Sequence, residues 1–146
     1  MGPKVGIGIL VIRDGKILMG KRKNAHGDGN WGFPGGHLEF FETVEDCTKR
    51  ELLEETGLTA NSVVLGPWKE IFFQKEKKHY LNLYSFVTDF SGAVENREPE
   101  KNECWQWHPI ETLPKPLFTP IEKIAIDNSL SDFLDTHLEK ISPTSV

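Results

Sequence analysis

Three glutamates between residues 51 and 55 are spaced so that their carboxylates share one face of a helix. Glu51, Glu54 and Glu55 stand at positions i, i+3 and i+4, which are neighbours on a helical surface. Like charges at this spacing repel, and each pair weakens an isolated helix by about 0.2–0.5 kcal/mol. A divalent cation among them would remove that cost, and hard carboxylate oxygens select Mg²⁺ or Mn²⁺. The alternative is an acidic helix face that contacts only solvent.

The residues around these glutamates add to the same chemistry. Glu42 supplies a fourth carboxylate just before the helix, and Arg50 is the nearby cation. Gly35 and Gly36 lack side chains, so their backbone groups can approach a ligand closely. The charged residues and the second glycine therefore stand at fixed offsets within one stretch, residues 36–58.

Residues 36–58 resemble the Nudix box, a motif written G-x5-E-x7-R-E-U-x-E-E-x-G-U, where U is aliphatic. All nine defined positions are filled, by Gly36, Glu42, Arg50, Glu51, Leu52, Glu54, Glu55, Gly57 and Leu58. A match of this length is highly specific, so a merely solvated acidic face becomes a minor alternative. The resemblance implies a metal-dependent hydrolase that cleaves a nucleoside diphosphate linked to a further group X.

The resemblance also implies roles for the motif residues. Arg50 would orient Glu51, and Glu42 would support the loop electrostatically. One or more Mg²⁺ ions, or Mn²⁺ as a substitute, would clamp the pyrophosphate and activate the attacking water. The implied metal ligands are the side chains of Glu51, Glu54 and Glu55 and the carbonyl of Gly35.

The general base of this family, or an extra metal ligand, lies on a loop downstream of the motif. Glu51 is itself one candidate for the base. Glu100 and Glu103 are the downstream candidates, and Glu103 is preferred. The alternative for both is a surface charge in solvent.

Similarity to the family extends beyond the motif, over residues 4–125. Arg22 would contact phosphates and His37 would line the site. Phe118 and Ile121 would flank the base, although core packing explains Phe118 equally well. The implied substrate-binding set is Arg22, Gly35, Gly36, His37, Phe118 and Ile121. Similarity to the small MutT-type branch, which includes the plant cytosolic and human thiopurine-nucleotide diphosphatases, lies at residues 18–22, 33–40, 98–103 and 113–118.

One residue departs from that branch. Phe41 stands just before Glu42, where the branch often has glycine. We expect the large side chain to alter the loop path or narrow the pocket, which bears on substrate preference more than on catalysis.

Hydrophobic periodicity and turn residues predict the elements that position these groups. Asp14-Gly15 is a strong hairpin signal between the first two strands. Thr43 is the expected N-cap and Gly57 the expected C-terminal residue of the motif helix, and Thr119 opens a last helix to about residue 141. The expected strands cover residues 5–12, 16–21, 31–33, 63–74, 80–90 and 104–108. This order predicts one α+β domain over residues 1–146, a Nudix-type α/β/α sandwich with a mixed central sheet.

Composition narrows the partners and the compartment. The formal net charge is −5 and the chain has no long basic stripe, which argues against a nucleic-acid polymer as partner. No segment reaches the roughly 20 apolar residues of a membrane span. Cys47 and Cys104 form no CxxC pair, which favours a reduced, cytoplasmic protein.

The motif indicates the reaction type and leaves the substrate open. We expect hydrolysis of a nucleoside triphosphate, whether ordinary, oxidised or otherwise modified, to the monophosphate and pyrophosphate. The alternatives are an NDP-sugar or ADP-ribose pyrophosphatase, or a catalytically silent domain that binds a nucleotide as a sensor. Phe33, Tyr80, Tyr84 and Phe118 can form a base-stacking wall or pack in the core. A homodimer is expected by analogy with small family members.

Overall fold

The computed structural model describes residues 2–23, 28–118, 120–121 and 135. Its helix is α1 (Val44–Thr56). Its strands are β1 (Lys4–Arg13), β2 (Lys16–Arg22), β3 (Trp31–Gly32), β4 (Gly35–His37), β5 (Thr59–Ala60), β6 (Val64–Phe73), β7 (Lys78–Val87), β8 (Phe90–Ser91) and β9 (Asn102–Pro109).

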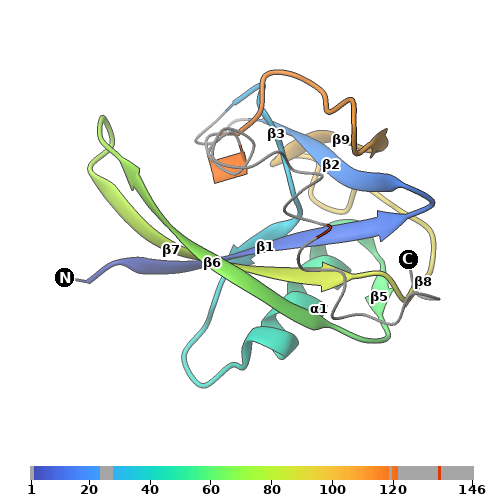
Figure 1. Ribbon diagram of the computed structural model, residues 1–146, viewed down its shortest axis with the longest axis horizontal. Helices are drawn as coiled ribbons and strands as arrows, with labels where there is room; N and C mark the ends of the chain where they lie inside the picture. The colour runs from blue at the N-terminus through green and yellow to red at the C-terminus, as the bar shows by residue number, and fades with distance from the viewer. Residues whose placement is uncertain (1, 24–27, 119, 122–134, 136–146) are drawn as a thin grey trace.

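β1 lies in the middle of a seven-stranded mixed sheet of order β3-β2-β1-β7-β6. It pairs in parallel with β7 from Lys4↔Tyr80 to Val11↔Val87, while its pairings with β2 and β4 are antiparallel. β9 joins the sheet through β2, and β5 and β8 form a separate two-stranded ladder. The predicted mixed sheet and α+β class are therefore confirmed, and Figure 1 shows α1 packed against one side of the sheet.

The two strands of the first hairpin separate soon after the turn. β1 pairs with β2 only at Ile12↔Ile17 and Arg13↔Lys16. Further along, β4 takes the place of β2 beside β1, and β2 pairs with β9 instead. Figure 1 shows the two strands diverging from the turn. Residues of both strands, Gly6 to Gly8 of β1 and Arg22 of β2, line a pocket.

β1 is buried on both faces, which explains its nearly continuous apolar sequence. Ile7, Ile9 and Val11 pack with α1 residues in one core cluster. Leu10 and Ile12 point to the opposite face and pack with residues of β2 and β7 in a second cluster. This alternation follows the two-residue period of a strand.

α1 begins and ends where the sequence predicts. The Thr43 hydroxyl accepts a hydrogen bond of 3.0 Å from the Asp46 N–H, which completes the N-cap. Gly57 takes a left-handed conformation, with φ of 77°, and donates its N–H to the Leu53 carbonyl. The glutamate-bearing helix therefore has a fixed start and a fixed end.

Three expectations need correction or lie outside the described residues. The short strands β4, β5 and β8 were not predicted, because two or three residues carry no periodicity. Phe41 does not narrow the pocket, because its side chain is 94% exposed and its φ of 65° keeps the loop path that a glycine would take. Of the last predicted helix, Pro120 and Ile121 are helical, and nearly all the rest lies outside the described residues.

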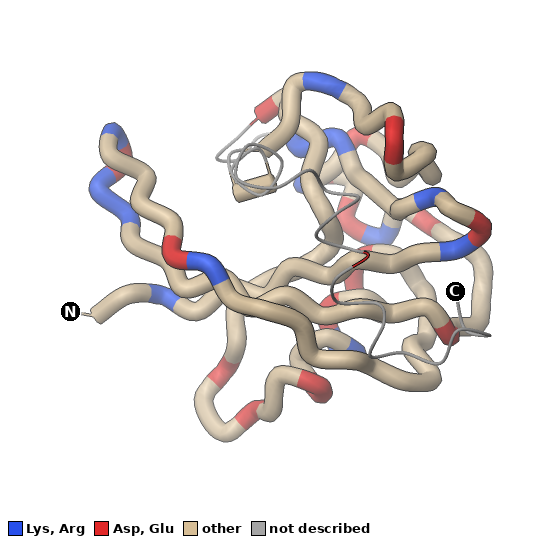
Figure 2. Tube along the Cα trace, in the orientation of Figure 1, with Lys and Arg blue, Asp and Glu red and all other residues tan. Residues whose placement is uncertain are grey.

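Charged residues are distributed unevenly over the tube in Figure 2. The tip of the β6–β7 hairpin carries Lys75, Lys77 and Lys78, whereas acidic residues mark the loop before α1. Within the residues described, no helix is both long and apolar enough to cross a bilayer.

Candidate active site

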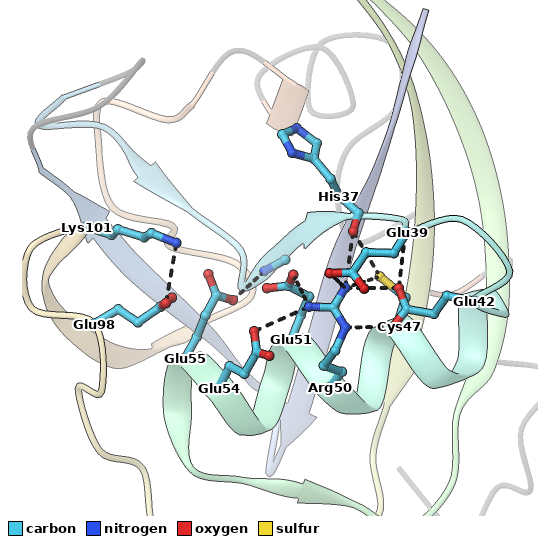
Figure 3. A network of polar contacts seen from close by, with 11 residues as sticks. His37, Glu39, Glu42, Cys47, Arg50, Glu51, Glu54, Glu55, Glu98 and Lys101 are labelled. Atoms are coloured by element: carbon cyan, nitrogen blue, oxygen red, sulfur yellow. Dashed lines mark hydrogen bonds and ion pairs between the residues drawn. The ribbon is translucent and has the colours of Figure 1, made fainter.

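The three helix glutamates have unequal environments. Glu55 is buried, Glu51 is largely covered, and the side chain of Glu54 is 52% exposed. The spacing does bring them to one side of α1, as Figure 3 shows. Glu51 and Glu55 line the pocket, while Glu54 lies at its outer edge, outside the lining residues.

Arg50 holds most of the acidic cluster together. Its Nε donates to Glu42 at 2.6 Å, and its Nη1 donates to Glu51 at 2.9 Å and to Glu54 at 3.3 Å. The hydrogen bonds from Arg50 lower the pKa of Glu42 to about 2. The carboxylates of Glu42 and Glu51 in turn raise the pKa of Arg50. The predicted orienting contact between Arg50 and Glu51 is present (Figure 3).

Glu55 is a buried carboxyl group that accepts a hydrogen bond from a neutral donor. The Gly35 N–H donates to its Oε2 at 2.8 Å. Burial nevertheless raises the pKa of Glu55 to about 8, and burial also raises the pKa of Glu51. Two carboxyl groups side by side in a poorly solvated place favour a bound cation, because a cation stabilises their charged forms.

The glycines before the loop leave room for this arrangement. A Cβ on Gly36 would strike the Glu51 carboxylate, and a Cβ on Gly35 would strike the Ile7 carbonyl oxygen. Across residues 2–23 and 28–118, no three acidic, His or Cys side chains converge on one point, since Arg50 and the Gly35 N–H hold the carboxylates. The oxygen donors fit a hard cation once Glu51 and Glu54 turn from Arg50 toward it.

A pocket of about 710 Å³ opens beside these carboxylates. Its lining includes Gly6 and Gly8 of β1 and also Arg22, whose guanidinium lies 4.0 Å above the centre of the Phe118 ring. The remaining predicted lining residues are also present: Gly35, Gly36, His37, Phe118 and Ile121. The pocket therefore combines carboxylates with a cation stacked on an aromatic ring.

His37 lies on the pocket wall beside Tyr80. The two rings stack with centroids 5.7 Å apart, and Nε2 lies 3.3 Å from the Tyr80 hydroxyl. Partial burial, with Lys4, Lys78 and Lys101, lowers the pKa of His37. At neutral pH its ring is therefore a neutral hydrogen-bonding group.

The downstream loop brings a different glutamate to the cluster than the one preferred from sequence. Glu103 is on β9, where it pairs with Lys21 at 3.3 Å and is absent from the pocket lining, and Glu100 is exposed. Glu98 instead lies beside Glu55 in Figure 3, close enough to raise the pKa of Glu51 and Glu55. Its position depends on the Arg97 N–H, which donates to the Glu55 carbonyl at the end of α1.

Several pocket residues had no signal in the sequence. Asn82 and Trp105 line the pocket because of where β7 and β9 lie, and no motif indicated them. Lys101 also lines it, and its ammonium is 3.4 Å from Glu98. Burial alone would lower the pKa of Lys101, but Glu98, Glu55 and Glu51 together raise it.

Comparison with known proteins decides the family. A family model described as the NUDIX domain matches residues 2–128. The chain belongs to the Nudix family. Its Nudix box, residues 36–58, is therefore the stretch from which the candidate site is built.

Relatives of this Nudix chain include enzymes named for different substrates. It is 42% identical over 107 residues to an oxidized purine nucleoside triphosphate hydrolase of Mus musculus, covering 73% of the chain and 66% of that protein. It is 32% identical over 126 residues to an ADP-ribose pyrophosphatase of Methanocaldococcus jannaschii, covering 86% of the chain and 72% of that protein.

A solved structure supports the same Nudix assignment. The crystal structure of a MutT NUDIX hydrolase from Burkholderia pseudomallei superposes with a TM-score of 0.81 at 33% identity. The match covers 87% of this chain and 98% of that one. The predicted family, fold class and enzyme class are thus confirmed.

Proposed function

We propose that this Nudix chain hydrolyses a nucleoside triphosphate, ordinary, oxidised or otherwise modified, to the monophosphate and pyrophosphate with the help of Mg²⁺. The observation that carries the proposal is the composition of one pocket. Glu51, Glu55 and Arg22 all line it, and the charge of Glu55 acts on Arg22. A metal-bound polyphosphate fits a pocket that offers both carboxylates and a guanidinium, which binds phosphate in bidentate geometry.

The aromatic side chains of the pocket support a nucleotide rather than inorganic polyphosphate. Phe33, Tyr80, Tyr84 and Phe118 all line it, and stacking on an aromatic ring contributes roughly 1–3 kcal/mol per base. Arg22 covers part of the Phe118 ring and His37 stacks on the Tyr80 ring, so Phe33 is the better stacking surface. The mouse relative, named for oxidised purine nucleoside triphosphates, has the higher identity of the two named relatives.

The second candidate is hydrolysis of ADP-ribose. The archaeal relative named for that substrate matches more of the chain, 86% against 73% for the mouse relative. Both substrates present a pyrophosphate to the same carboxylates, so the candidates differ in what occupies the rest of the pocket. A catalytically silent sensor is the weaker alternative, because every box glutamate is kept.

The proposed division of labour follows from the contacts. Glu51, Glu54, Glu55 and the Gly35 carbonyl would hold the metal. When bound, the ion would neutralise charge on phosphoryl oxygens and lower the pKa of a bound water. Arg50 holds Glu51 beside the pocket through the 2.9 Å hydrogen bond until Glu51 turns to the ion. Water forms a bond to one phosphorus, the bridging P–O bond breaks, and a nearby carboxylate takes the proton of the water.

The substrate assignment is tested with a panel of nucleotides and with isotope-labelled water. Triphosphates should give monophosphate and pyrophosphate, and ¹⁸O from the solvent should appear in one of the two products. Inorganic orthophosphate as the first product would contradict the proposed bond cleavage. A higher kcat/KM for ADP-ribose or an NDP-sugar than for every triphosphate would favour the second candidate.

The identity of the proton acceptor gives a separate prediction. Glu98 and Glu103 both lie outside the pocket lining and each pairs with a lysine, but only the charge of Glu98 is among those that raise the pKa of Glu55. Glu98→Gln is therefore expected to lower kcat about 10²-fold, the lower end for loss of a general base, and Glu103→Gln should change kcat less than about twofold. Steady-state kinetics on the two variants distinguish them. The reverse order of effects would restore Glu103 to the role expected from sequence.

Three further expectations remain proposals. Residues 1–146 form one domain, the protein acts in the cytoplasm, and it assembles as a homodimer. Cys47 and Cys104 are both free thiols, which agrees with a reducing compartment.

A further inference from the structure

Lys101 is a cation inside a group of carboxylates. Its Nζ lies 3.4 Å from Glu98 Oε2, and its side chain lines the same pocket as Glu51 and Glu55. In Figure 3 the Lys101 and Glu98 head groups point toward Glu55. A lysine here places a positive charge beside the carboxylates that are proposed to hold the metal.

The backbone of Lys101 is fixed, although its side chain is not. The Lys101 carbonyl accepts a 2.8 Å hydrogen bond from the Lys23 N–H, and its own N–H donates to the Glu98 carbonyl at 2.9 Å. The side chain itself is 60% exposed. An exposed ion pair contributes little to stability, so the ammonium can leave Glu98 at small cost while its base stays next to the end of β2.

Arg22 is the last residue of β2 and shares the pocket wall with Lys101. The two cations thus come from adjacent chain segments, because Arg22 pairs with Asn102 in the β2–β9 ladder. A polyphosphate bound near the carboxylates and Arg22 would be within reach of the Lys101 side chain, which has a flexible four-carbon stem. Lysine binds phosphate as a mobile point charge, which suits this task.

We propose that Lys101 is an exchangeable counter-ion: it neutralises Glu98 before the divalent ion binds, and it turns to a phosphate group of the substrate afterwards. The inference rests on the proposed function in that the ligand carries phosphates at the metal site. Lys101 thereby weakens metal binding in the free protein and strengthens phosphate binding in the metal-loaded protein. A merely structural role for Lys101 would not have opposite effects on metal binding and on phosphate binding.

The test uses the full chain and two probes that need no knowledge of the nucleotide. Mn²⁺ alone is titrated and followed by electron paramagnetic resonance. Methylenediphosphonate, whose P–C–P bridge water does not cleave, is then titrated at saturating Mn²⁺ by calorimetry. The variants are Lys101→Met, with Lys101→Gln as a second neutral variant, and Lys101→Arg. Lys49→Met is the matched control, since Lys49 pairs with Glu45 on α1 at 3.4 Å and lies outside the pocket lining.

Both neutral variants at position 101 should bind Mn²⁺ about 3- to 10-fold more tightly, because one repelling charge is gone. They should bind the diphosphonate about tenfold more weakly. The dissociation constants of Lys101→Arg should stay within about threefold of those of the parent in both titrations. Those of Lys49→Met should match those of the parent. A folded neutral variant that binds Mn²⁺ more weakly, or the diphosphonate as well as the parent does, overturns the inference.

These outcomes are independent of the nucleotide panel. A protein that cleaves no triphosphate but gives both shifts would retain the counter-ion role and lose the proposed substrate. A protein that cleaves triphosphates yet gives neither shift would retain the function and lose the role of Lys101.

Discussion

Replacing Glu51 with glutamine is expected to lower kcat by about 10²–10⁴, the range for losing a general base or an electrostatic stabiliser. Glu51 lines the pocket, is oriented by Arg50 at 2.9 Å, and is a proposed metal ligand. Glu55→Gln should lower kcat by a similar factor, because this change removes the buried carboxylate beside Glu51. Steady-state kinetics at saturating Mg²⁺ measure both.

The fold should tolerate these changes. Burial raises the pKa of both Glu51 and Glu55, so a neutral amide replaces a carboxylate that is costly to keep charged without a metal. Thermal unfolding in EDTA should therefore show no large loss of stability. Glu45→Gln is the matched control, since Glu45 pairs with Lys49 on the same helix, outside the pocket lining. Turnover close to that of the parent in the Glu51→Gln/Glu55→Gln double variant would sink the assignment of the site.

Removal of divalent metal is expected to abolish turnover completely. Carboxylates alone repel the negative charge that develops on phosphoryl oxygens, so the pocket needs a cation to work. EDTA should stop hydrolysis, and added Mg²⁺ or Mn²⁺ should restore it. Zn²⁺ should restore less, because all proposed ligands are oxygens.

Metal uptake should also release a proton. The pKa of Glu55 is about 8 in the metal-free protein, so at pH 7 its carboxyl group is largely protonated and has to ionise to become a ligand. Calorimetric Mg²⁺ titrations in buffers of different ionisation enthalpy measure this proton, and the release should disappear above about pH 9. Full activity in a rigorously chelated sample would refute the metal requirement itself.

The helix and the clustering of its glutamates were predictable because both follow from local spacing. Thr43 and Gly57 mark the helix ends through hydrogen bonds within a few residues, and Glu51 and Glu55 share a face through the helical period alone. The same holds for the Asp14-Gly15 hairpin, since the turn residues favour positive φ, and both have it.

The rest of the site depends on contacts between distant segments. Spacing alone did not indicate that Glu98 lies near Glu55, because that position involves contacts between distant segments such as the hydrogen bond from the Arg97 N–H to the Glu55 carbonyl. The pocket itself exists because β1 and β2 separate beyond Ile12↔Ile17. A hairpin signal predicts that two strands pair, and it carries no information about where the pairing stops.

The parallel pairing of β1 with β7 also sets the order in which a growing polypeptide can become an enzyme. Gly6 and Gly8 line the pocket, yet their sheet partners are Asn82 and Tyr84. A chain emerging from the ribosome at about 5–20 residues per second presents the glutamate helix seconds before that partner strand. Until β7 arrives, one edge of β1 has no parallel neighbour, and non-local pairings of this kind form slowly. Catalytic competence is thus acquired late in synthesis, although the segment that carries the chemistry is translated early.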